Sequence, residues 1–194
     1  MNWWENEFLK VKENRLYLEE KPAERIAREH GTPVYVYSQK QVLRNFQNLK
    51  EAFSSAKPGL EVRIAYAMKA NPHPGILKLL LKAGAFIDAV SPAEVESALK
   101  AGFPEEKIMF TGTSISQEDF EQVLRHPGVT VNIDAYEQIK ILETARRRLR
   151  LKKPVRMAVR WNPGLGRGFS SKTVTAGKRS SDGIPIKFGV EDAR

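Results

Sequence analysis

Four charged side chains stand at or near the ends of apolar stretches of this chain. Lys69 ends RIAYAMK, Asp88 interrupts FIDAVS, Glu94 follows in PAEVESALKAG, and Arg160 ends VRMAVR. A charged group is costly in a hydrophobic core but common in an active site, where carboxylates and cations set each other's charge. The four residues are therefore candidates for one catalytic site.

Lys69 carries the most specific chemistry of the four. If RIAYAMK is a strand, alternation places Ala65, Ala67 and Lys69 on one face, where two small side chains leave space beside the amine. A lysine amine in such a space can form a Schiff base with the carbonyl of a substrate, as in an aldolase, or of pyridoxal phosphate. Two structural interpretations stay open. Lys69 lies past the strand in solvent, or it forms a purely structural ion pair with a carboxylate.

The elements that must position these residues recur at a constant step. Tyr66, Asp88, Phe110 and Asn132 lie 22 residues apart, each in an apolar stretch that precedes a helical pattern. Alternating strands and helices predict right-handed βαβ units and a parallel sheet, so the fold class is α/β. The short step favours a (β/α)₈ barrel over an open doubly wound sheet. The predicted strands cover 62–70, 86–91, 107–114, 129–135 and 154–164, and the predicted helices cover 73–84, 92–102, 116–126 and 136–148.

A shorter pattern precedes these units. NRLYLEE (14–20) and TPVYVYS (32–38) predict strands, and the segment between them predicts a helix that begins at Pro22 and ends at Gly31. Apolar residues at helical spacing predict a second helix over 39–53. We expect residues 1–34 to form a short N-terminal segment and residues 35–194 to hold about the first five units of the barrel.

Composition excludes several kinds of site and partner. The 194 residues contain no cysteine, and His30, His73 and His126 lie in predicted helix ends and loops, so we expect no metal. No apolar run approaches the roughly 20 residues of a membrane span, and the N-terminus is unlike a signal peptide, so we expect a cytoplasmic protein with no membrane partner. The net charge of +9 is concentrated in RRRLRLKK, which suits a helix C-terminus. No nucleic-acid-binding motif accompanies it, so we expect no nucleic-acid partner.

A family resemblance rests on three motifs. YAMKAN followed by FIDAVSPAEVESALKAG resembles the barrel of the alanine-racemase-like pyridoxal-phosphate decarboxylases. VRWNPGLGRGFSSKTVTAG resembles their RVNPG region, and IKFGV resembles their SKFG segment. The likeness extends from about Thr32 to Val190 and is greatest to family members that act on diaminopimelate.

The resemblance implies a cofactor, an activity and roles for the four charged residues. Lys69 would form the Schiff base with pyridoxal 5′-phosphate, Asp88 and Glu94 would set its orientation and protonation, and Arg160 would face the cofactor's ring hydroxyl. The implied reaction is decarboxylation of meso-2,6-diaminopimelate to L-lysine, the last step of lysine biosynthesis. Decarboxylation of ornithine, arginine or another basic amino acid stays open, as does a barrel that holds the cofactor without catalysis.

The resemblance also implies features outside these motifs. Family members are homodimers, and residues 1–34 correspond to part of their β-domain. Ile186 stands where the family has a serine, and KRSSDGIP makes a longer segment before it. The ring-stacking histidine, the phosphate-binding turn and the glutamate at the pyridine nitrogen would follow Arg194. We therefore expect residues 1–194 alone to be poorly soluble and without decarboxylase activity.

Overall fold

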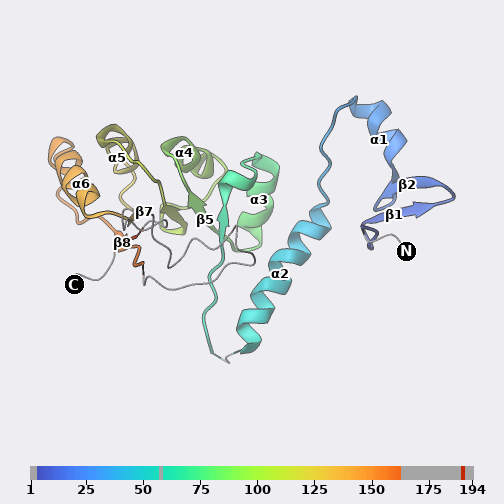
Figure 1. Ribbon diagram of the computed structural model, residues 1–194, viewed down its shortest axis with the longest axis horizontal. Coiled ribbons are helices and arrows are strands. Elements are labelled where there is room, and N and C mark those ends of the chain that lie inside the picture. Colours follow the sequence, from blue (N-terminus) through green and yellow to red (C-terminus); the bar gives the residue numbers. More distant parts are fainter. Residues whose placement is uncertain (1–3, 57–58, 163–188, 191–194) are drawn as a thin grey trace, which may run out of the picture. The chain divides into compact units, whose positions relative to one another are not determined.

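The computed structural model describes residues 4–56, 59–162 and 189–190, in two compact units, Met1–Arg63 and Ile64–Arg194 (Figure 1). The first unit holds a three-stranded antiparallel sheet and two helices: β1 (Leu9–Lys12), β2 (Arg15–Leu18), β3 (Lys21–Pro22), α1 (Ala23–His30) and α2 (Gln39–Ala56). The units divide after Arg63, and the expected division at residue 34 stays a prediction.

Both predicted helices of the first unit are confirmed, but one predicted strand is wrong. α1 follows Pro22 and ends at Gly31, whose φ of 79° suits a glycine. The segment 32–38 forms no strand, and no described segment pairs with it. A strand needs a neighbour's backbone N–H and C=O groups, and the side chain of Tyr35 is 89% exposed instead of packed. The hairpin strand β1 was not predicted.

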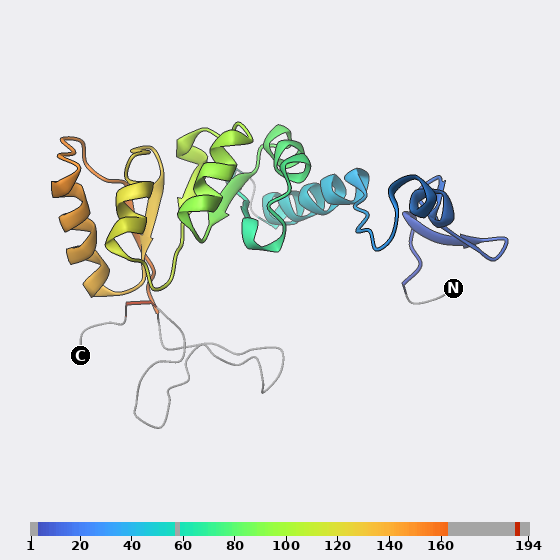
Figure 2. The same ribbon diagram turned by 90° about the horizontal axis from the view of Figure 1, so that it is seen from above.

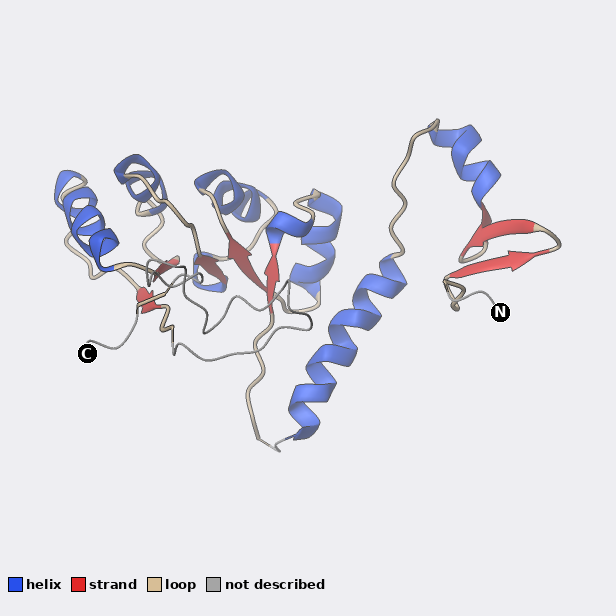
Figure 3. Ribbon diagram, in the orientation of Figure 1, coloured by secondary structure: helices blue, strands red, loops and turns tan. Residues whose placement is uncertain are grey.

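The second unit is a five-stranded parallel sheet with helices along one face (Figures 2 and 3). Its strands pair in chain order, as predicted. The strands are β4 (Ala65–Ala67), β5 (Phe86–Ala89), β6 (Ile108–Phe110), β7 (Thr130–Ile133) and β8 (Met157–Val159). The helices are α3 (Pro74–Lys82), α4 (Pro92–Lys100), α5 (Gln117–Val123) and α6 (Tyr136–Arg148), with 3₁₀ turns η1 (Met68–Ala70) and η2 (Glu105–Lys107).

Local signals explain where these helices begin and end. The Ser91 hydroxyl accepts a hydrogen bond from the Glu94 amide at 3.3 Å and so caps α4. Ser116 and Asp119 form a reciprocal capping box at the start of α5. Gly84 and Gly102, with φ of 88° and 101°, follow the last turns of α3 and α4.

The hydrophobic core lies between the sheet and the four helices. Ile87, Ile108 and Ile133 are fully buried on the side of the sheet that faces the helices. Alternation turns the residues between them, such as Asp88 and Met109, to the opposite face. The helices contribute the buried side chains Leu77, Leu80, Val95, Ala98, Phe120, Val123, Leu142 and Ala145. One face of the sheet is therefore core, and the other is available for a site.

The sheet continues in chain order beyond β8. Val190 forms a parallel bridge with Trp161, and the Asn162 amide donates to the Val190 carbonyl at 2.8 Å. A Cβ atom on Gly189 would lie 3.0 Å from the Arg160 carbonyl oxygen, so this close approach requires a glycine. The NPG region after Asn162, Ile186 and the segment 178–185 lie outside the described residues.

Candidate active site

Lys69 lies on a turn and not in a strand. β4 ends at Ala67, and η1 carries Met68, Lys69 and Ala70, so the prediction of a strand through residue 70 is wrong. Prolines at positions 72 and 74 explain the early end, since they remove backbone donors and the second of them begins α3. Met68 is fully buried, whereas the Lys69 side chain is exposed. The amine is thus presented at the carboxyl end of β4 without being buried.

A hollow opens on the face of the sheet that the helices leave uncovered. It has a volume of about 420 Å³ and is lined by Ala65, Asp88, Met109, Thr111, Asn132 and Arg160. Strand register explains this grouping, because Asp88 pairs with Ala67 on one side and with Met109 on the other. Lys69 follows two residues after Ala67, at the carboxyl end where parallel β/α folds place their active sites.

The lining includes a polar pair that the sequence prediction missed. The Asn132 side-chain amide donates to the Thr111 hydroxyl at 2.7 Å across neighbouring strands. Both residues are partly buried beside Asp88 in the hollow. The available signal was alternation along the strand, because Asn132 lies between the apolar residues Val131 and Ile133, which are buried in the core, and so falls on the opposite face.

The backbone of Arg160 is held between two neighbouring segments. Its amide donates to the Ile133 carbonyl at 2.7 Å, and its carbonyl accepts from the Val190 amide at 2.7 Å. Its side chain lines the hollow, although β8 ends one residue earlier and the predicted strand runs through Arg160 to residue 164. The hollow thus carries a cation on its β8 wall and a carboxylate on its β5 wall.

Glu94 is placed apart from this lining. Its carboxylate accepts a hydrogen bond from the Val90 amide at 2.8 Å and so closes the turn between β5 and α4. Gln138 has the equivalent contact with the Asp134 amide at 2.9 Å, before α6. The repeated contact is a helix-start device, and the role of Glu94 toward a cofactor stays a prediction.

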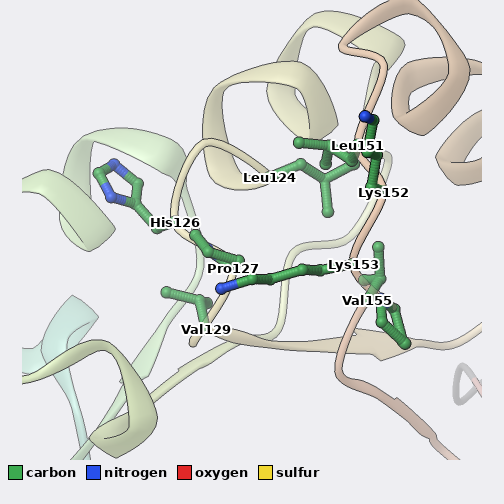
Figure 4. Close-up of a pocket in the computed structure, with 9 residues that line it drawn as sticks. Leu124, His126, Pro127, Val129, Leu151, Lys152, Lys153 and Val155 are labelled. Carbon is green, nitrogen blue, oxygen red and sulfur yellow. The ribbon is translucent and has the colours of Figure 1, made fainter.

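A second hollow, at the opposite ends of the strands, has a different character (Figure 4). It measures about 220 Å³ and lies between the loops before β7 and β8, with walls that include Leu124, Val129 and Val155. Lys152 and Lys153 stand at it, and no carboxylate is among its lining residues. His126 also lines it, but the hollow lies at the amino ends of the strands, whereas parallel β/α folds place their active sites at the carboxyl ends, so this hollow is not the candidate site.

Two of the histidines, His73 and His126, have structural contacts. His73 caps α3, because its Nδ1 accepts from the Gly75 amide at 3.1 Å. His126 lies between Glu96 and Glu105, with Nε2 and Nδ1 at 2.8 and 3.3 Å from their carboxylates. No group of three metal-ligating side chains occurs within the described residues. None of the helices in the described ranges is long and apolar enough to cross a membrane.

The residues around the first hollow suit pyridoxal phosphate. An exposed amine is available for its aldehyde, small Ala65 leaves space, and the lining offers both a carboxylate and a guanidinium. The volume also falls within the roughly 300–1,000 Å³ of small-molecule sites. Chemistry and size therefore agree with the cofactor that the motifs imply.

Comparison with known proteins decides the family. Residues 39–193 match the sequence profile described as "Pyridoxal-dependent decarboxylase, pyridoxal binding domain". The chain belongs to the pyridoxal-dependent decarboxylase family. The cofactor of this family is pyridoxal 5′-phosphate, and the resemblance read from the motifs is confirmed.

Named relatives of this family member are diaminopimelate decarboxylases. The enzyme of Methanothermobacter thermautotrophicus is 34% identical over 160 residues, which are 82% of this chain and 35% of that protein. The enzyme of Helicobacter pylori strain J99 is 34% identical over 172 residues, 87% of this chain and 39% of that protein. This chain therefore spans well under half the length of the curated relatives that it matches.

A solved structure confirms the fold class. Diaminopimelate decarboxylase of Methanocaldococcus jannaschii, in complex with L-lysine, superposes with a TM-score of 0.81 at 28% identity. The match covers 96% of this chain and 42% of that one. The parallel β/α units of this family member are therefore of the (β/α)₈-barrel type, as predicted.

Proposed function

We propose that the protein carrying this chain decarboxylates meso-2,6-diaminopimelate to L-lysine, with pyridoxal 5′-phosphate held covalently by Lys69. The observation that carries the proposal is the place of Lys69. It is an exposed amine on the turn that follows β4, the strand whose Ala65 lines a hollow with Asp88 and Arg160, in a chain of the decarboxylase family. The relatives at 34% identity are named for this reaction.

The lining residues would hold the cofactor by complementary charge and shape. The Lys69 amine makes the covalent link, and the Asp88 carboxylate balances positive charge on the amine or on the ring. The Arg160 guanidinium offers donors to an anionic oxygen of the cofactor. The Thr111 and Asn132 pair adds polar contacts along the same wall. We propose that Glu94 supports the turn beside Asp88 and does not contact the cofactor.

The protein and the cofactor divide the chemistry. When bound, pyridoxal phosphate supplies a carbonyl for the amine and a ring that accepts the electron pair left by departing carbon dioxide. Lys69 remains at the site after a substrate amine replaces it, and its Nζ can then carry a proton to the product. Being exposed on a turn, this amine can move without leaving a buried charge unpaired.

Substrate choice within the family favours diaminopimelate. The relatives of Methanothermobacter thermautotrophicus and Aquifex aeolicus, at 34% and 29% identity, carry that name, whereas the lysine/ornithine decarboxylase of Vibrio vulnificus is 21% identical with a TM-score of 0.55. That second likeness shows the fold alone. We further propose a cytoplasmic homodimer without nucleic-acid partners, in line with the motif resemblance.

The first experiment is covalent trapping at Lys69. The purified protein is incubated with pyridoxal phosphate, reduced with borohydride and mapped by peptide mass spectrometry. We expect the cofactor adduct on Lys69, no adduct there in Lys69→Ala, and an unchanged adduct in Lys78→Ala, which removes an exposed lysine of α3. An adduct spread over several exposed lysines would contradict a dedicated site.

The second experiment compares substrates. Carbon dioxide release is measured with diaminopimelate, ornithine, arginine and lysine at equal concentrations. We expect turnover with diaminopimelate and its loss in Lys69→Ala. Faster release from ornithine or arginine would assign the protein to another branch of the family, and trapping without any turnover would indicate a barrel that only holds the cofactor.

A further inference from the structure

Side-chain hydrogen bonds brace the turn that carries Lys69. The Tyr66 hydroxyl donates to the backbone carbonyl of Asn71 at 3.1 Å and so spans the turn from the strand before it to the residue after it. The Asn71 side-chain oxygen accepts from the His73 amide at 3.0 Å. Met68 anchors the middle of the turn in the core. Lys69, between these contacts, has an exposed side chain.

Tyr66 reaches this turn from the side opposite the hollow. It pairs in register with Ile87, which is fully buried, and its ring packs against the helix-facing core. Ala65 and Ala67 flank it in β4, and Ala65 lines the hollow. Tyr66 therefore acts on the site through the backbone and not by touching a bound cofactor.

We infer that Tyr66 is a positioning residue for Lys69, an inference that rests on the proposed role of Lys69 as the cofactor-binding amine. A three-residue 3₁₀ turn has poorer hydrogen-bond geometry than an α-helix and little rigidity of its own. The Tyr66 hydroxyl supplies the missing constraint, so the Lys69 backbone keeps one position relative to the hollow. The long lysine side chain then has fewer conformations to search before its amine meets the cofactor.

The test removes the hydroxyl and keeps the ring. Tyr66→Phe should speed hydrogen exchange in the peptide 68–74, measured without cofactor by mass spectrometry. It should also slow pyridoxal phosphate capture at Lys69, measured by timed borohydride trapping, by about 3- to 10-fold, the value of one ordinary hydrogen bond. Tyr17→Phe is the matched control, since the Tyr17 hydroxyl bonds to no described residue, and it should change neither readout.

A second pair of variants tests the other hydrogen bond of this turn. Asn71→Ala removes the oxygen that accepts from the His73 amide, whereas Asn71→Asp keeps an acceptor there. We expect slower capture and faster exchange in Asn71→Ala, with recovery in Asn71→Asp. Asn71→Ala keeps the backbone carbonyl that accepts from Tyr66, so this pair tests the side-chain contact alone, and equal capture in both variants would leave the Tyr66 hydroxyl as the brace of the turn.

The two readouts separate failure of the inference from failure of the proposed function. Parent-like exchange and parent-like capture in Tyr66→Phe would overturn the positioning role while leaving Lys69 as the cofactor lysine. Absence of any Lys69 adduct in the parent protein would overturn the proposed function. The exchange measurement would then still decide whether Tyr66 holds the turn.

Discussion

The Lys69 side chain is exposed on a turn, so replacing it should change the free energy of unfolding very little. Exposed substitutions away from special contacts usually change stability by less than about 0.5 kcal/mol. We therefore expect Lys69→Ala to unfold at nearly the parent temperature, even though it loses cofactor capture. Met68→Ala, at the fully buried neighbour, should lose about 2–5 kcal/mol. Thermal melts followed by circular dichroism compare the two, and a large loss in Lys69→Ala would show that the amine is structurally buried.

Gly128 is required for steric reasons in the loop before β7. A Cβ atom there would lie 2.6 Å from the Glu105 Cβ, closer than real side chains approach. The Gly128 amide also donates to the Glu105 carboxylate at 2.7 Å, so the two segments cannot easily separate. We expect Gly128→Ala to cost about 1–3 kcal/mol, measured by urea unfolding. An unchanged midpoint would mean that the loop shifts freely.

At the scale of elements, side-chain caps fix the starts of α3, α4 and α5. Ser116→Ala removes one half of the capping box of α5, and helix caps of this kind are worth about 0.5–2 kcal/mol. Ser54→Ala is the control, because Ser54 lies in the exposed last turns of α2 and its hydroxyl bonds to no described residue. We expect a lower melting temperature for the first variant only. Equal melting of both would show that Asp119 holds the helix start without the hydroxyl.

A carboxylate between α5 and α6 makes part of the stability pH-dependent. Hydrogen bonds from Gln117, and then from Arg148, hold the pKa of the Glu121 carboxyl below its ordinary range. A group whose pKa is lowered by folding stabilises the fold when ionised, and this contribution disappears as the pH falls through the lowered pKa. Glu121→Gln should therefore melt slightly below the parent at neutral pH and level with it in strong acid. Glu20→Gln, an exposed control, should show no such trend.

The repeating elements were predictable, because their signals are local. Periodic apolar residues, Pro92 after Ser91, and Gly84 after α3 each specify a helix boundary within a few residues. The parallel order of the strands followed from the 22-residue step. The barrel-side positions of Asp88 and Arg160 followed from alternation along those strands.

What the sequence did not reveal depends on contacts between distant residues. The end of β4 at Ala67 is set partly by the Tyr66 bond to Asn71, and the segment 32–38 is no strand because no described neighbour pairs with it. The hydrogen bond from Asn132 to Thr111 links β7 to the residue that follows β6. The residue pattern of neither strand alone indicates this contact. The Glu94 carboxylate accepts a hydrogen bond from the Val90 amide, a contact that the motif alone did not predict.

At the scale of the molecule, β8 presents an apolar row to solvent. Met157, Val159 and Trp161 are 46%, 53% and 61% exposed, on alternate residues, and no described helix covers them. Contiguous apolar surface of this kind binds hydrophobic dyes and promotes association. Residues 1–194 should therefore enhance the fluorescence of an apolar dye, and Met157→Thr with Val159→Thr should reduce it. Val11→Thr in the N-terminal hairpin is the control, and equal reduction by both would place the dye elsewhere.

The pairing of each strand with its neighbour in the chain has a consequence for how the protein is made. Sheets built from sequential units have short loops to close, and domains emerge from the ribosome N-terminal part first. β4 with Lys69 is thus synthesised first, the Asp88 wall follows, and Arg160 arrives only with the fifth strand. The proposed cofactor site is therefore assembled late, and a nascent chain exposes Lys69 well before the opposite wall exists.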